Sequence, residues 1–441
     1  MKLIFQFTLP TLLGMLFQQL YNMVDSMIVG KLLGAQALGA VGSTGAISFF
    51  VLGFCMGLCN GFAIPVAQRV GAGDFFHVRR FSANSGYLCA FFALILTTVT
   101  ALSCRWILSV MQTPADLMED AYAYIFVIFL GIPVLFLYNM LSGIIRSLGD
   151  SKTPVYFLAL SSLLNIVLDV VFILYFHLGV AGAALATVIS QGISGIACFI
   201  YMVRAFPVLR MNEAERKFDL HSCKILCAMG IPMGLQYSIT AIGSIVIQSA
   251  VNTLGSLSVS AVAAASKLSQ PLACPYDALG ATMATYCGQN VGALKLSRLG
   301  KGIRSAVILG FAYAALSLTF ILLFARPALM LFLDPAEPEL EALLALSSRY
   351  ITISVAFFAC LTLVNVVRFS IQGMGFSSFS MISGVLEMIA RVIMGQCLLP
   401  VLGFTAACYA NPAAWILADC FLIPAAILCI RKLKSTYQTY T

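Results

Sequence analysis

Charge is scarce in this sequence, because only 10% of its 441 residues are Asp, Glu, Lys or Arg, against ~25% in a soluble domain. Hydrophobic residues make up 61%, and the mean hydropathy is +0.98. This composition excludes a soluble enzyme. Apolar runs near ~20 residues, the length that crosses a ~30 Å hydrocarbon core, recur from end to end. The chain is therefore expected to be an all-α integral membrane protein.

The sequence also lacks the motifs of several functional classes. It contains no HExxH, GxSxG or GxxxxGK[ST] pattern, and its three histidines (His77, His177, His221) all fall near loops. The 14 cysteines form no CxxC pair and lie mainly in apolar segments, which is typical of packing residues. We therefore expect no enzymatic activity, no ATP hydrolysis, no bound cofactor and no nucleic-acid partner.

Apolar runs between charged or Pro/Gly-rich breaks predict twelve spans. Eighteen of the 25 Lys and Arg residues fall on the side of the N-terminus, four on the other side and three within spans. Because basic residues concentrate in cytoplasmic loops, this distribution predicts cytoplasmic N- and C-termini in a multi-pass protein of the bacterial inner (cytoplasmic) membrane. The predicted spans are 5–30, 43–68, 84–104, 121–144, 155–177, 181–203, 225–250, 258–286, 303–325, 348–373, 378–400 and 405–430.

The two halves of the chain repeat each other. Gln-Arg-Val-Gly-Ala at 68–72 recurs as Gln-Asn-Val-Gly-Ala at 289–293, and Arg105 recurs as Arg326, both 221 positions on. Tyr124 recurs as Tyr350 at a spacing of 226. Six spans per half place both repeats in the same orientation, related by a pseudo-two-fold axis along the membrane normal. We expect an N-terminal six-helix bundle over 1–210, a cytoplasmic linker over 211–224 and a C-terminal six-helix bundle over 225–441.

Carboxylates inside spans are the first candidates for function. Each buried charge costs ~2.5–3.5 kcal/mol even on the mild insertion scale, so intramembrane acids are functional by default. Asp25 lies on the first span with Tyr21 four residues before it, and Asn165 and Asp169 share one face of the fifth span. Such oxygen donors can hold Na⁺ or share a proton, whereas the alternative is a set of polar contacts that lock helices together.

These residues stand in a recognisable series of motifs. Val-Asp-Ser-Met-Ile-Val-Gly after Pro10, Ala-Gln-Arg-Val-Gly-Ala-Gly-Asp ending at Asp74, Ile-Arg-Ser-Leu-Gly-Asp ending at Asp150, and Asn-Ile-Val-Leu-Asp at 165–169 resemble the multidrug and toxic compound extrusion (MATE) family over the whole chain. The resemblance implies two six-helix bundles around a V-shaped central cavity. It also implies export of cationic or amphipathic compounds in exchange for H⁺ or Na⁺ by alternating access.

Within that family the chain is most similar to the DinF-like branch, which implies a cation site in the N-terminal bundle. The matching positions are Asp25, Asn165, Asp169 and Thr187, with the carbonyl of Ala183, and Tyr21, Tyr124 and Asn139 match their polar neighbours. Pro10 matches a helix-bending proline. The seventh span has no carboxylate, which departs from the branch with a C-terminal site and puts a second site in doubt.

Other intramembrane polar residues predict a substrate cavity: Asp277, Glu387, Arg391, Asp419 and Gln236. Glu387 and Arg391 have the i,i+4 spacing of an ion pair, which is an equally good structural explanation for both, and Asp277 has a possible partner in Lys267. The alternative function is a lipid-linked oligosaccharide flippase of the same superfamily, for which more basic residues in spans are expected. We expect a monomer whose partners are the bilayer and a small drug-like or metabolite substrate.

Overall fold

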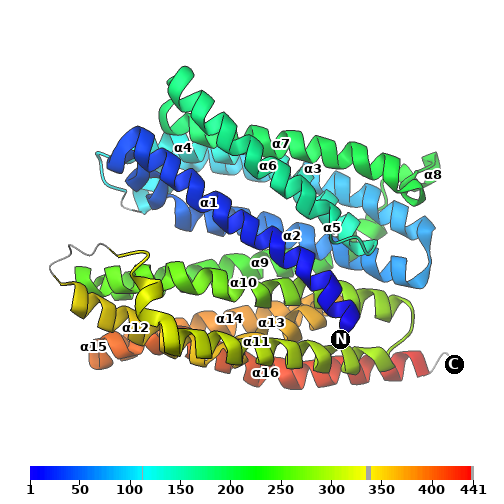
Figure 1. Cartoon of the computed structure of the whole chain (residues 1–441). Helices are drawn as coiled ribbons and strands as arrows, with labels where there is room; N and C mark the ends of the chain where they lie inside the picture. Colours follow the sequence, from blue (N-terminus) through cyan, green and yellow to red (C-terminus); the bar gives the residue numbers. More distant parts are fainter. Residues whose placement is uncertain (112, 334–338, 439–441) are drawn as a thin grey trace. The chain divides into compact units, whose positions relative to one another are not determined.

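The structure, a computed structural model, describes residues 1–111, 113–333 and 339–438, and these residues form helices connected by short loops (Figure 1). The all-helical prediction is confirmed. The elements are α1 (Lys2–Ser43), α2 (Gly45–Ala72), α3 (Phe75–Val110), α4 (Met118–Leu130), α5 (Ile132–Ser147), α6 (Thr153–Val170), η1 (Val171–Tyr175), α7 (Gly179–Ala205), η2 (Pro207–Leu209), α8 (Glu213–Arg216), α9 (Leu220–Asn252), α10 (Ser256–Gly292), α11 (Ser297–Leu329), α12 (Leu340–Ala356), α13 (Phe358–Gly373), α14 (Ser377–Val392), η3 (Ile393–Leu398), α15 (Leu399–Leu402) and α16 (Phe404–Gln438).

Each predicted span coincides with one long helix or with two or three consecutive helical elements. Within the described ranges, nine helices are long and apolar enough to cross a membrane, and two bent pairs, α4 with α5 and α12 with α13, bring the number to eleven. The remaining predicted span, 258–286, lies in α10, a helix of 37 residues that contains Pro271 and Pro275. Polar side chains such as Lys267 and Asp277 lower the hydropathy of α10.

The helices group into two compact units whose boundaries differ from the expected bundles. Unit 2 comprises Leu13–Ser238, and unit 1 comprises Met1–Leu12 with Ile239–Thr441. The change from one unit to the other therefore occurs inside α1 and inside α9, not in the linker over 211–224. The physical reason is that α9 is one continuous helix. Met229 and Met233 in its first half are buried in unit 2, whereas Ile247 and Val251 in its second half join the core of unit 1.

The backbone confirms the internal repeat. Gly34 and Gly255, 221 positions apart, have φ values of 90° and 93°, and Gly149 and Gly375, 226 apart, have 96° and 97°. Both bent helix pairs turn by 46°. The π-helical segments η1 and η3 follow α6 and α14 in the same way. Positive φ favours glycine, so the repeated glycines mark chain turns that both halves share.

Close packing of α2 against α9 explains the glycines spaced by four in α2. A Cβ on Gly61 would lie 2.4 Å from Cα of Gly230, and a Cβ on Gly57 would lie 2.6 Å from the Met233 carbonyl oxygen. Helices without side chains at the crossing point approach at backbone distance, as small-xxx-small motifs allow in membranes. Gly53, Gly57 and Gly61 thus serve helix packing in this part of unit 2.

The connection between α7 and α9 is fastened to α3. Arg79 bonds the Glu215 carboxylate at 2.6 Å and the Val208 carbonyl at 3.1 Å, and Arg80 pairs with Asp219 at 3.3 Å. Asn212 and Glu215 form a capping box at the start of α8. The hydrogen bond from Arg79 lowers the pKa of Glu215. The linker is thus held to the first half of the chain by charge-assisted hydrogen bonds.

Candidate cation site

Two helices of unit 2 carry the carboxylates predicted from the sequence. Asp25 lies on α1 and is 7% exposed, and Asn165 and Asp169 lie one turn apart on α6 with 1% and 0% exposed. Burial on α6 follows from its position beside α7, the helix with which it makes its most extensive contact. The sequence places apolar residues around each of these polar side chains, so they face protein rather than lipid.

Thr187 on α7 joins three of the predicted residues through its hydroxyl group. It donates to the Ala183 carbonyl at 3.2 Å, and it accepts from the Asn165 amide at 3.2 Å. The Tyr21 hydroxyl lies 3.1 Å from the same oxygen. Because the single hydrogen of Thr187 is used on Ala183, Tyr21 must be the donor in that bond. Both lone pairs of the Thr187 hydroxyl are then occupied. The three side chains and the Ala183 carbonyl form one connected set.

The acceptor oxygens next to this set receive no hydrogen bond from a donor among the described residues. They are Oδ1 of Asp25, Oδ1 of Asn165 and both carboxyl oxygens of Asp169, and all four atoms are buried. Buried polar groups are nearly always hydrogen-bonded, and an unsatisfied one costs about 1–3 kcal/mol. Four such acceptors from two helices therefore make this set the candidate site for a cation or a proton.

The two carboxyl groups lie within hydrogen-bonding range of each other. Two buried carboxylates in contact repel strongly unless a proton is shared or a cation lies between them. Oxygen atoms are the ligands that Na⁺-like hard cations prefer, and the same atoms accept a proton. No group of three or more His, Cys, Asp or Glu side chains suited to a metal ion occurs among the described residues, so the set consists of two acids and neutral oxygens.

The predicted neighbours differ in how they relate to this set. Tyr124 lies near Asp25, Tyr21 and Asp169. Asn139 instead donates its amide to the Leu135 carbonyl of its own helix at 2.9 Å. Pro10 lies in the part of α1 that belongs to unit 1, and the helix continues through it, since the only residue of α1 with non-helical backbone angles is Gly34. The bend predicted at Pro10 stays a prediction.

An apolar cluster lies one helical turn from the acids, and no sequence motif predicts it. Val29 follows Asp25 by four residues, Ile173 follows Asp169 by four, and both are buried with Val180 and Ala183. The ring of Tyr124 packs against the same cluster. These side chains exclude water from one side of the carboxyl pair, which strengthens electrostatic interactions inside the site.

The other predicted polar residues are divided between the two units. Gln236 is buried in unit 2, whereas the remaining four belong to unit 1. Glu387 and Arg391 form the predicted i,i+4 ion pair at 3.3 Å, and Arg368 on α13 also bonds Glu387. Asp277 is exposed and lies near Arg368, and no ion pair joins it to Lys267.

Asp419 has both carboxyl oxygens buried without a hydrogen-bond partner, and it too lies near Arg368. The sequence had indicated Arg368 only as one of three cations inside spans, not as the residue that these acids share. A role of these side chains in substrate binding stays a prediction.

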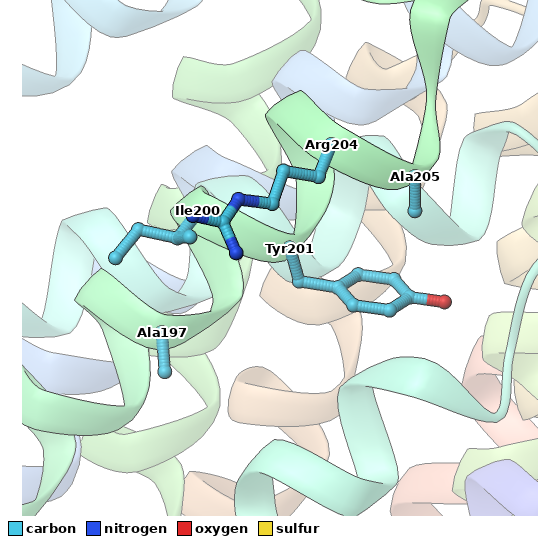
Figure 2. Close-up of a pocket in the computed structure, with 5 residues that line it drawn as sticks. All are labelled: Ala197, Ile200, Tyr201, Arg204 and Ala205. Atoms are coloured by element: carbon cyan, nitrogen blue, oxygen red, sulfur yellow. The ribbon is translucent and has the colours of Figure 1, made fainter.

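A surface hollow of about 470 Å³ lies along the last turns of α7, away from the acids (Figure 2). It is lined by Ala197, Ile200, Tyr201, Arg204 and Ala205. In Figure 2 the Arg204 side chain extends back along the helix towards Ile200, and the Tyr201 ring points to the other side. The ring packs against Phe157 and Phe206. The hollow contains no acid and is not part of the candidate site.

Comparison with known proteins places the chain in a family. The MatE family profile matches residues 10–171 and 232–396, which include α1 from Pro10 and the acids on α1 and α6. The chain belongs to the MatE family. It is 33% identical over 306 residues to the probable multidrug resistance protein YpnP of Bacillus subtilis (66% of this chain, 65% of that protein). It is 27% identical over 338 residues to the probable multidrug resistance protein YoeA of the same organism (75% and 73%).

Solved structures agree on the fold. An outward-facing multidrug resistance MATE family transporter superposes with a TM-score of 0.89 at 22% identity, covering 98% of this chain and 96% of that one. The twelve-helix fold class predicted from the sequence is confirmed by this likeness. The match to YpnP spans about two thirds of that protein's length, at 65%. The DinF-like branch stays a prediction.

Proposed function

We propose that the protein is a secondary active exporter of cationic or amphipathic small molecules, driven by an opposing flow of H⁺ or Na⁺. The observation that carries this proposal is the buried pair Asp25 and Asp169 with its unpartnered oxygens. Family membership and the names of the relatives support multidrug export rather than catalysis. The distribution of Lys and Arg supports cytoplasmic N- and C-termini in a bacterial membrane.

Coupling follows from differential binding. A cation that enters between Asp25 and Asp169 neutralises two acids that otherwise repel, so it stabilises the arrangement of α1 and α6 seen here. A substrate that favours a different arrangement of α1 is bound less tightly once the cation is in place. The two ligands then exclude each other, and the inward gradient of the ion drives the outward movement of the substrate.

Thr187 and its bonds to Ala183, Asn165 and Tyr21, here called the Thr187 hub, position the cation ligands. Its bond to the Asn165 amide nitrogen fixes which end of that amide carries the free oxygen, and its bond to Tyr21 connects α7 to α1. Since α1 contributes Asp25, any change at the acids is transmitted to the helix that carries Tyr21. The apolar cluster around Val29 and Ile173 keeps the ion from passing through the bundle as a leak.

The test is energised efflux measured in everted membrane vesicles. Asp25→Asn keeps size and polarity but removes the charge, and it is expected to abolish ion-driven accumulation of a fluorescent organic cation while membrane insertion is unchanged. Asp116→Asn, the same chemical change at an exposed loop residue, is the matched control and is expected to transport normally. Undiminished transport by Asp25→Asn would end the proposal.

A further inference from the structure

Arg391 is an arginine in the interior of unit 1 that is only 5% exposed. Its Nη2 donates to Oε2 of Glu387 at 3.3 Å, and its Nε donates to Oδ1 of Asn411 on α16 at 3.2 Å. An arginine in a membrane span is costly, so its burial requires a specific set of partners. The internal repeat relates Arg391 and its partners Glu387 and Asn411 to residues in the first half of the chain.

The helices α6 and α14 align at a spacing of 222 residues. Ser161, Leu164 and Val170 recur as Ser383, Leu386 and Val392, and a π-helical segment follows each helix directly. At this spacing Asn165 corresponds to Glu387. Asp169 corresponds to Arg391, so the position of an acid in unit 2 is taken by a cation in unit 1.

The partners correspond as well. The turn glycines Gly179 and Gly403 are 224 positions apart and have φ of 58° and 56°, and the same spacing pairs Thr187 with Asn411. Both residues accept a side-chain hydrogen bond from the neighbouring helix, Thr187 from Asn165 and Asn411 from Arg391.

The aromatic neighbour is repeated in the same way. Tyr350 corresponds to Tyr124, and it lies in hydrogen-bonding range of Asn411 and close to Arg391. Tyr124 likewise lies close to Asp25 and Asp169. The framework of the cation site therefore occurs in both units.

The helix α1 supplies Asp25 in unit 2, but the corresponding helix of unit 1, α9, supplies no acid at the matching position. At the spacing of 221 that relates Gly34 to Gly255, Asp25 corresponds to Val246 on α9, so no acid comes from this helix. One turn earlier, Gly243 provides space, because a Cβ there would lie 3.2 Å from Cδ of Arg391 and 3.4 Å from its Nη1. The helix thus lacks the second acid and accommodates the arginine side chain.

We infer that unit 1 holds a second copy of the cation-site framework, in which the guanidinium group of Arg391 takes the place of the mobile cation. This inference rests on the cation site proposed for unit 2. Glu387 is the remaining acid of the copy, and it is bonded by both Arg391 and Arg368. A cation that is part of the chain cannot leave, so unit 1 exchanges no ion and transport is coupled through unit 2 alone.

The inference predicts a latent binding site for a small organic cation. Arg391→Ala removes the guanidinium and leaves Oε2 of Glu387 and Oδ1 of Asn411 facing the vacated space. The full-length variant in detergent is expected to melt several degrees below the wild type. Methylguanidinium chloride at millimolar concentration is expected to restore at least half of the lost Tm in a saturable manner, whereas tetramethylammonium chloride at equal ionic strength restores none.

The matched control is the double variant Glu387→Gln with Arg391→Ala, which lacks the acid and is expected not to respond. An equal response of this double variant, or no saturable response of Arg391→Ala, would overturn the inference. If Arg391→Ala does not fold, Arg391→Lys and Arg391→Met replace it. If a cation fixed to the chain completes the site, Arg391→Lys is more stable than Arg391→Met. A more stable Arg391→Met would contradict the inference. Because the readout is thermal, it is independent of the transport test on Asp25.

Discussion

Asn165 donates its side-chain amide to the hydroxyl of Thr187 at 3.2 Å, and its own amide oxygen is left buried without a partner beside Asp169. One bond thus fixes the orientation of the amide and leaves its acceptor oxygen available to a cation. An amide in the opposite orientation would offer donors in place of this acceptor and would compete with a cation. The Thr187 oxygen has no free lone pair for a cation. Thr187 therefore acts on the site by orienting Asn165.

Thr187→Ala tests this role of Thr187. The variant loses the three hydrogen bonds of the hydroxyl, so Asn165 and Tyr21 lose their shared partner. A loss of about 1.4 kcal/mol, within the range expected for one to three net hydrogen bonds, would raise the ion concentration for half-maximal transport by roughly ten-fold. Thr187→Ser keeps the hydroxyl and is expected to stay near the wild type. Ion titration of transport in vesicles compares the three proteins, and equal ion dependence in all of them would contradict the role of Thr187.

Tyr21→Phe separates the bond between α1 and α7 from the orientation of Asn165. The variant removes only the donor to Thr187, while the amide of Asn165 keeps its bond. We expect ion affinity to change by less than in Thr187→Ala, by about two- to five-fold, which corresponds to about 0.5–1 kcal/mol for a single net hydrogen bond. A loss equal to that of Thr187→Ala would mean that the hub acts through Tyr21 alone.

The glycines of α2 give a prediction on stability. Gly61→Ala would place a Cβ 2.4 Å from Cα of Gly230, an overlap that the backbone of α9 has to relieve. Overpacking of this kind costs about 1–3 kcal/mol, so the Tm of the purified protein is expected to fall by several degrees. Gly86→Ala on α3 is the control, because a Cβ there meets nothing within 4 Å. An unchanged Tm for Gly61→Ala would show that α2 and α9 are farther apart than described.

The bonds from Arg79 and Arg80 that hold the linker to α3, here called the linker clamp, give a prediction on pH. The pKa of Glu215 is lowered in the folded protein by its bond from Arg79, so the clamp is fully formed above the usual glutamate value near 4.5 and is lost as the pH falls through the lowered folded value. Amide hydrogen exchange over 206–219 is expected to be slow at pH 6 and, after correction for the intrinsic rate, less protected below pH 4. Glu215→Gln is expected to show weak protection at both values. Protection that is independent of pH in the wild type would remove Glu215 from the clamp.

Much of the fold follows from the sequence. The twelve spans are predictable because hydropathy decides which segments enter a bilayer, and each coincides with one helix or with consecutive helical elements. Asp25, Asn165 and Asp169 stand out because polar residues in a span are costly. By contrast, the unit boundary inside α9 depends on which neighbours each half of a continuous helix contacts, and no local pattern encodes that.

The remaining features required three-dimensional contacts. The bond from Arg368 to Glu387 joins residues on two helices, and the sequence offers only the i,i+4 spacing of Arg391 as a partner. The break in α1 falls at Gly34, because glycine adopts positive φ without strain. The correspondence of Asp169 with Arg391 depends on the π-helical segments η1 and η3, which follow α6 and α14 directly and set the spacing of 222 between the two helices.

The most direct test of the central claim is ion-driven transport by the purified protein in proteoliposomes. An imposed Na⁺ gradient and an imposed pH gradient are applied separately to vesicles that contain the wild type, Asp25→Asn or Asp169→Asn, and the movement of ethidium is followed by fluorescence. We predict that one of the two gradients drives ethidium against its concentration difference in the wild type and that neither gradient does so in the two variants. Gradient-driven accumulation that persists in Asp25→Asn and Asp169→Asn would contradict the account.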